Sequence, residues 1–146
     1  MATQARRAQG TLLKLGDGGS PESFTTIAEL TKIDTTFKAD DLDASNHDTP
    51  SSWKEFVPGM KEAEIKIAGN FIPEDATQDA TTGLLSHFIA GDQANYQLIF
   101  PGLPGDPSPL EIDAAMVVME MSPKADAKAI LTFDASLKFA GAPTFV

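Results

Sequence analysis

The sequence predicts a mainly β protein: an antiparallel β-sandwich or barrel with one α-helix packed against it. Two observations carry this prediction. Six or seven segments alternate apolar and polar residues with the two-residue period of a half-buried strand, and glycine- and proline-containing turns separate them. Only one segment, 76–90, repeats its apolar residues at helical spacing. Many strands with a single helix are typical of a sandwich or barrel that carries a helix on one side.

The strands can be predicted in order along the chain. The segment 129–139 is the clearest, because its apolar and polar residues alternate without a break. In 24–34, Ile27 and Ile33 fall out of phase, which indicates either a bulge or a strand covered on both faces. Pro58-Gly59 is a strong turn signal that would join two strands. The expected strands are 11–15, 24–34 with an extended continuation to 40, 62–72, 95–100, 111–122 and 129–139, with 144–146 as a tail.

The helix is predicted over Ala76–Ala90. Asp75 followed by Gln78 resembles a capping box at its start. Gly91 is a plausible C-terminal stop. Gly83 would weaken such a helix by ~1 kcal/mol relative to alanine.

Length and composition favour one domain that is not built to bind nucleic acid. The chain has 146 residues, with 21 acidic and 11 basic residues giving a net charge of -10, whereas nucleic-acid binders rely on basic residues. There is no cysteine, so zinc–thiolate sites and disulfides are excluded. No apolar run is long enough for a membrane span, and Arg6-Arg7 is not followed by an apolar segment, so we expect a soluble protein used without export. We expect an N-terminal arm and first short strand over 1–23 and the main domain over 24–146.

The segment 40–52 is expected to be a long loop, because it holds four acids, no base and mostly small turn-forming residues. Loops of this length inside a compact domain are usually functional or disordered. We therefore expect it to contact other chains rather than line a pocket. Trp53 and Phe56 at its end could be core anchors or plugs between subunits.

Segment 111–122 leaves two interpretations open. Both of its faces are largely apolar beyond Ala114. It could be a central strand buried on both faces. Alternatively, the face that carries Met119 and Met121 could meet another subunit, because methionine-rich surfaces adapt to their partners.

No residue pattern supports catalysis or a metal site. Asp41, Asp43 and Ser45 have the alternate spacing of a calcium loop, but Asn46 stands in place of the turn glycine and Ser52 in place of the bidentate glutamate. His47 and His87 have no second ligand at a metal spacing. A Ser-His-Asp arrangement need not be contiguous, yet no catalytic motif supports one. We expect a protein that is not an enzyme and has no cofactor.

Several segments, taken together, resemble the major tail tube proteins of long-tailed bacteriophages. The first are 43–48 (DASNHD) and 53–62 (WKEFVPGMKE), followed in order by 69–71 (GNF), 96–101 (YQLIFP) and a C-terminal run that ends in GAPTF. The similarity extends from about Phe24 to Phe145. Ser45 stands where threonine is usual in the family and Met60 where leucine is usual, and there is no room for the C-terminal immunoglobulin-like domain that some members carry.

The resemblance implies a tube subunit with the predicted fold, assembled into stacked hexameric rings around a channel for DNA. It implies partners in the tail (tape measure, distal tail and terminator proteins), a virion location after synthesis in the host cytoplasm, and no membrane. DNA would pass without specific binding, and six copies would give a ring charge of about -60 that repels phosphates. The expected interface residues are Asp40, Asp41, Asp43, Ser45, Asn46, His47, Asp48, Trp53, Phe56, Met119 and Met121.

Two alternatives to a phage tail tube stay open. A related injection device, such as a secretion-system or bacteriocin tube, would use a similar subunit. A small acidic β-barrel that binds or hydrolyses a ligand would instead be a monomer with a closed pocket.

Overall fold

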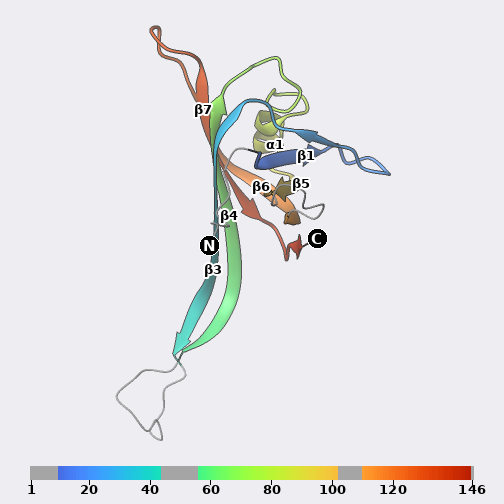
Figure 1. Cartoon of the computed structure of the whole chain (residues 1–146), viewed down its shortest axis with the longest axis vertical. Helices are drawn as coiled ribbons and strands as arrows, with labels where there is room; N and C mark the ends of the chain where they lie inside the picture. Colours follow the sequence, from blue (N-terminus) through green and yellow to red (C-terminus); the bar gives the residue numbers. More distant parts are fainter. Residues whose placement is uncertain (1–9, 44–55, 102–109, 146) are drawn as a thin grey trace, which may run out of the picture.

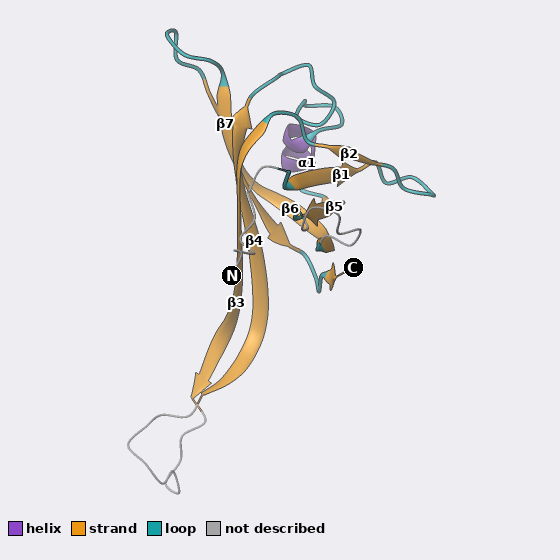
Figure 2. Ribbon diagram, in the orientation of Figure 1, coloured by secondary structure: helices purple, strands orange, loops and turns teal. Residues whose placement is uncertain are grey.

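A computed structural model describes residues 10–43, 56–101 and 110–145, and these form an antiparallel sheet with one short helix (Figures 1 and 2). Every strand pair runs antiparallel. The predicted fold class is therefore confirmed. The elements are β1 (Leu12–Gly16), β2 (Phe24–Thr26), β3 (Leu30–Asp43), β4 (Phe56–Asn70), α1 (Leu84–Ala90), β5 (Gln93–Ile99), β6 (Glu111–Lys124), β7 (Thr132–Phe139) and β8 (Thr144–Phe145).

The strands follow the order β2-β1-β5-β6-β7-β4-β3, and β8 pairs with β6. β6 joins two halves of the sheet, because residues 111–117 pair with β5 whereas the residues beyond the irregularity after Val118 pair only with β7. We call β3, β4, β7 and residues 118–124 of β6 the long panel, and β2, β1, β5 and residues 111–117 of β6 the short panel. Figure 2 shows the strands of the short panel running at an angle to those of the long panel, with α1 beside the short panel.

The core lies between these panels and is built from the alternating residues that the sequence singled out. Ile65 and Ile67 on β4 and Phe133 and Leu137 on β7 are almost fully buried. Burying each such side chain contributes about 1.5–3 kcal/mol. The core cluster comprises Leu13, Leu15, Ile27, Ile65, Ile67, Leu84, Tyr96, Leu98, Ile112, Ala114, Met116, Val118, Phe133, Ala135 and Leu137.

The predicted turn at Pro58-Gly59 is wrong, because both residues lie within β4. Pro58 is paired with Asp41 of β3. Proline is tolerated here because β4 pairs with β7 only from Glu64 onward, so the missing N–H is not needed by a second neighbour. The first four residues of the predicted loop also belong to β3, while the rest of that loop, 44–52, lies outside the described residues.

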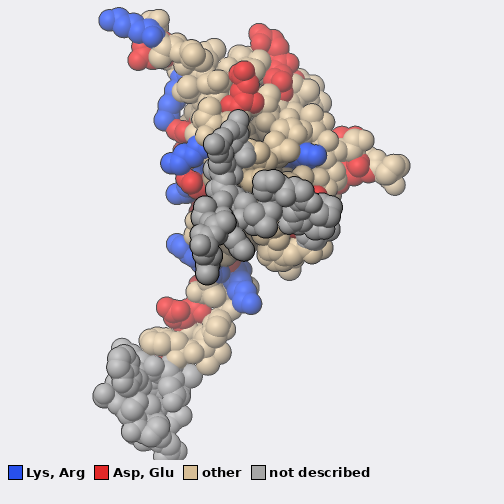
Figure 3. Space-filling model, in the orientation of Figure 1, with Lys and Arg blue, Asp and Glu red and all other residues tan. Residues whose placement is uncertain are grey.

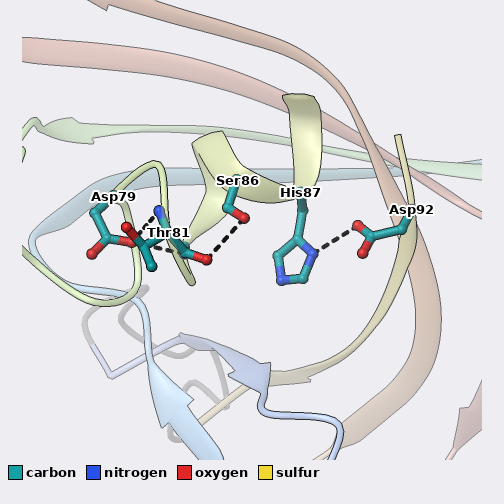
Figure 4. Close-up of polar contacts among 6 residues, drawn as sticks. Asp79, Thr81, Ser86, His87 and Asp92 are labelled. Atoms are coloured by element: carbon teal, nitrogen blue, oxygen red, sulfur yellow. Dashed lines mark hydrogen bonds and ion pairs between the residues drawn. The ribbon is translucent and has the colours of Figure 1, made fainter. Parts of the chain in front are cut away.

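The helix is shorter than predicted, because side chains in 75–83 bind the backbone N–H groups that a helix would use. Asp79 Oδ1 accepts hydrogen bonds from the backbone of Thr82 and Gly83 (Figure 4 shows Asp79 beside α1). Such local bonds compete with helix formation. Gln78, expected in a capping box, is instead fully buried. The predicted stop at Gly91 is confirmed, since Gly91 is left-handed and its N–H donates to the carbonyl of His87.

The expected strand 24–34 is two strands with different partners, not one strand with a bulge. β2 pairs with β1 and β3 pairs with β4. Between them the chain makes a turn at residues 28 and 29, in which Glu29 has a left-handed φ of 53°. This change of partner explains the phase shift at Ile27, which is buried against the short panel through a bond from its N–H to the Leu13 carbonyl.

Two further points concern the C-terminus and the helix. The expected tail pairs instead with β6 through Phe145 and Thr144, so it forms β8. The only helix in the described part of the chain is too short to cross a membrane.

Candidate assembly surfaces

The long panel has a charged face opposite its core face. Side chains on β4 alternate between the core and this outer face, as Ile65 and Glu64 do. The strand register aligns the outward positions of all four strands. The charged residues of this face are Lys32, Asp34, Lys38, Glu62, Glu64, Lys66, Glu120, Lys124, Asp134 and Lys138.

Opposite charges are neighbours on the charged face. Across strands, Asp34 is paired with Lys66, and Lys38 with Glu62. Lys32 Nζ lies 3.3 Å from Asp34 Oδ2. Figure 3 shows basic and acidic groups alternating along the margin of the molecule where Figure 1 places these strands. Directly opposite charges stabilise a sheet modestly.

Glu64 has the most structured environment on this face. Ser136 Oγ donates a hydrogen bond of 2.6 Å to Glu64 Oε1. This bond, together with the nearby positive charges of Lys66 and Lys138, holds the pKa of Glu64 below its ordinary value. On the same face, Lys124 forms an ion pair with Asp134, and this interaction raises the pKa of Lys124.

Two edges of the long panel are unpaired within the described residues. Among the described strands, β3 pairs with β4 alone, so the other side of residues 30–42 presents unpaired backbone groups. In β6, residues 118–124 pair with β7 alone. Unpaired strand edges are ready templates for pairing with another chain.

The ends of β3 and β4 form an arm that projects from the body (Figure 1). We define this arm as residues 39–43 of β3 and 56–61 of β4, where β4 has no second neighbour. Its apolar side chains are exposed: Leu42 by 54%, Phe56 by 57% and Met60 by 83%. The interpretation of Phe56 as a core anchor is therefore wrong. Asp40, Asp41 and Asp43 are also exposed on the arm, as strand residues rather than loop residues.

A second apolar surface lies where the arm joins the body. The ring of Phe37 lies 5.9 Å from that of Phe139 and 6.3 Å from that of Phe145. These rings, with Met60 and Pro143, line an open groove of about 830 Å³. We call it the phenylalanine groove. Sequence reasoning missed it because it depends on β8 bringing Phe145 next to β3.

The two methionines of β6 have different environments. Met121 lies opposite Ala135 and packs against the core. Met119 is 53% exposed at the irregularity between Val118 and Glu120. The interpretation of 111–122 as a strand buried on both faces is therefore wrong at Met119. This residue lies where the unpaired edge of β6 begins.

The polar residues around α1 do not form a nucleophile–base pair. Ser86 Oγ donates to the Thr81 carbonyl at 3.1 Å, and His87 Nδ1 lies 2.8 Å from Asp92 Oδ1 (Figure 4). Ser86 thus points away from His87. Among the described residues, no group of three potential ligands is arranged to hold a metal ion. The expected interface residues Ser45, Asn46, His47, Asp48 and Trp53 lie outside the described residues.

These features define a small antiparallel β protein whose described residues leave two sheet edges and two apolar surfaces uncovered. Comparison with known families identifies it further. The chain belongs to the phage tail tube protein family, whose model matches residues 6–145. The resemblance stated from the sequence is confirmed, and the chain is a structural tail tube protein. No curated protein matches it.

Solved structures share the fold at low sequence identity. A chain in the tail of an empty gene transfer agent particle with C6 symmetry superposes with a TM-score of 0.80 and 23% identity, covering 97% of this chain and 99% of that one. A chain of the SPP1 tail tube gives 0.75 and 9% identity, covering 95% and 77%. A chain of the anti-feeding prophage baseplate gives 0.63 and 9%, covering 100% and 97%.

Proposed function

We propose that six copies of this chain close into a ring, and that stacked rings form a tube through which DNA passes. The observation that carries the proposal is the long panel, which has two edges that no described strand pairs with and a polar face opposite its core. The C6 symmetry of the gene transfer agent tail supports six as the number of copies.

Ring closure would join the unpaired edge of β3 to the unpaired edge of β6 in the next copy. The long panel has four strands, and neighbouring strands alternate in direction. In copies related by rotation about one axis, β3 and the neighbouring β6 would therefore run antiparallel, like every other pair. Each new pairing would satisfy backbone groups that are otherwise left to water.

The same geometry selects the face that lines the channel. The core face of the long panel is covered by the short panel and α1, so these would lie outside the closed barrel. The charged face would then line the interior. Six panels of four strands, spaced about 4.8 Å apart and tilted by about 40°, would give a barrel ~50 Å across its backbone. After subtraction of the side chains, such a channel is wide enough for a DNA duplex.

The arm would connect one ring to the next. Its exposed apolar residues Leu42, Phe56 and Met60 have no cover within the described part of the subunit. Contact with a neighbouring ring would bury them, and the predicted contacts of Asp40, Asp41 and Asp43 would lie on the same arm. Met119 and Met121 would lie at the edge where neighbours within a ring meet. The contacts predicted for residues 45–48 and for Trp53 extend this proposal beyond the described residues.

The remaining expectations follow from this role. The tube would meet the tape measure, distal tail and terminator proteins, and the subunit would be made in the host cytoplasm and end in the virion. It would act without catalysis or a cofactor. A second candidate is the tube of a related injection device, which the similarity to a chain of the anti-feeding prophage baseplate favours.

Negative-stain electron microscopy of the concentrated full chain tests the assembly. We expect rings or tubes with six-fold end views. Met119→Asp, which places a charge at the β6 edge, should abolish them without unfolding the subunit. Ile89→Asp on α1, where the native side chain is 69% exposed, is the matched control and should assemble normally. A wild-type chain that stays monomeric at every concentration would contradict the proposal.

A further inference from the structure

The charge of this protein is distributed very unevenly. The chain has 21 acidic and 11 basic residues, and the charged face holds five of each. The remaining 16 acidic and six basic residues therefore account for the entire net charge of -10. This face is therefore balanced in charge, so the repulsion of DNA expected from the net charge would have to come from other surfaces.

Each lysine of the charged face has an acidic neighbour. Lys32 and Lys124 make ion pairs with Asp34 and Asp134. The strand register sets the other three lysines directly opposite acids: Lys66 opposite Asp34, Lys38 opposite Glu62 and Lys138 opposite Glu64. The pairing is thus a property of the sheet register and not only of side-chain rotamers.

This pairing has a consequence for a polyanion that passes close by. Proteins bind DNA non-specifically by neutralising phosphates with lysine and arginine, which releases counterions. A lysine whose charge is already compensated by a carboxylate has little to gain from a phosphate. A uniformly acidic face would instead oppose the entry of DNA, because like charges repel along the whole channel.

We propose that the charged face is a charge-compensated surface for double-stranded DNA, in which paired carboxylates prevent five lysines from binding phosphates. The inference rests on the proposed function, which makes this face the channel lining. It adds that the carboxylates act by neutralising neighbouring lysines and not by repelling DNA.

The test removes the carboxylates and keeps the lysines. In the variant Asp34→Asn/Glu62→Gln/Asp134→Asn, the charged face would carry five lysines and two acids. The control Glu29→Gln/Asp41→Asn/Glu74→Gln removes three exposed acids that lie outside the charged face and changes the net charge of the chain by the same amount. Retention of a short DNA duplex by the full-length protein is measured from about 50 to 200 mM salt, with circular dichroism as the check on folding.

We expect the wild type and the control to leave the duplex free, and the face variant to bind it. Its affinity should fall with salt, with a slope of up to about -3 in log K against log salt, as expected for a net excess of three positive charges on the face. Equal binding by the control, binding by the wild type, or no binding by the folded face variant would each overturn the inference. Tube formation is scored separately by microscopy, so failure to assemble would contradict the proposed function and leave the binding comparison readable on free subunits.

Discussion

The strands β3 and β4 pass through two environments, the body and the arm, and the difference between them separates folding from assembly. In the body, Ile65 and Ile67 are buried beneath the short panel, and the alternate residues form the charged face. In the arm, no second layer of described residues covers the same two strands, yet Leu42, Phe56 and Met60 are apolar and exposed. Apolar residues that stabilise no core within the subunit are best explained by a surface that other copies cover.

The largest expected effect comes from truncating the body. Ile65→Ala should lower the free energy of unfolding by about 2–5 kcal/mol, because it removes buried methyl groups and leaves a cavity. Val57→Ala, on the arm, should change it by less than about 0.5 kcal/mol. Chemical denaturation of the subunit under conditions where it is monomeric measures both. Similar losses at the two positions would break the distinction between body and arm.

A second large effect concerns a polar residue in the body. The side-chain amide of Gln78 donates to the carbonyls of Ala28 and Asn70, and its oxygen accepts from the N–H of Ile72. Gln78→Ala would leave these partly buried groups unsatisfied and should cost about 2–4 kcal/mol. Thermal unfolding measures the loss, and Glu74→Ala, at an exposed site in the same turn, should be close to neutral. A neutral Gln78→Ala would show that this turn does not help to hold the body together.

The arm should show the opposite behaviour. Phe56→Ser should leave subunit stability within about 1 kcal/mol but raise the concentration needed for tube formation at least tenfold, which corresponds to about 1.4 kcal/mol per subunit. Sedimentation of tubes across a concentration series gives this value. Ile89→Ser, which also removes an exposed apolar side chain, serves as the control. Normal assembly by Phe56→Ser would contradict a role of the arm in tube formation.

The smallest effect lies where the charged face is most ordered. The pKa of Glu64 is lowered in the folded protein, mainly by the hydrogen bond from Ser136. Glu64 therefore adds stability above its unfolded pKa of about 4.3, and this stability is lost as the pH falls through the lower folded pKa. Ser136→Ala should raise the pKa of Glu64 toward its ordinary value, as measured by an NMR titration of the side-chain carboxyl. An unchanged pKa would mean that the charges of the nearby lysines, and not the Ser136 hydrogen bond, lower the pKa of Glu64.

The sequence predicted the parts of the fold that depend on local alternation. The alternation around Ile65 and around Phe133 predicted both strands and their buried faces, because a two-residue period requires one face to differ from the other. The same alternation also predicts the charged face, since Glu62, Glu64 and Lys66 occupy the positions that alternate with the buried residues of this strand. The cross-strand partners of these residues depend on register, which the sequence does not give directly.

Two of the incorrect predictions, at Pro58-Gly59 and at the C-terminus, share one cause: the local signal was overridden by a distant partner. Pro58-Gly59 has the composition of a turn, but pairing with β3 keeps it in a strand. Thr144 and Phe145 are too few to show a period, and only β6 makes them a strand. The phenylalanine groove could have been suspected from Phe37, which continues the inward phase of Ile33, but not located without β8.

The measurement that tests the account most directly is amide hydrogen exchange of the arm in the free subunit and in the assembled tube. In the free subunit, we predict fast exchange over residues 39–43 and 56–61 and slow exchange around Ile65 and Leu137. In the tube, the arm and the unpaired edges of β3 and β6 should become protected. An arm that is already as protected as the body in the monomer, or that remains unprotected in the tube, would contradict the claim that other copies complete this subunit.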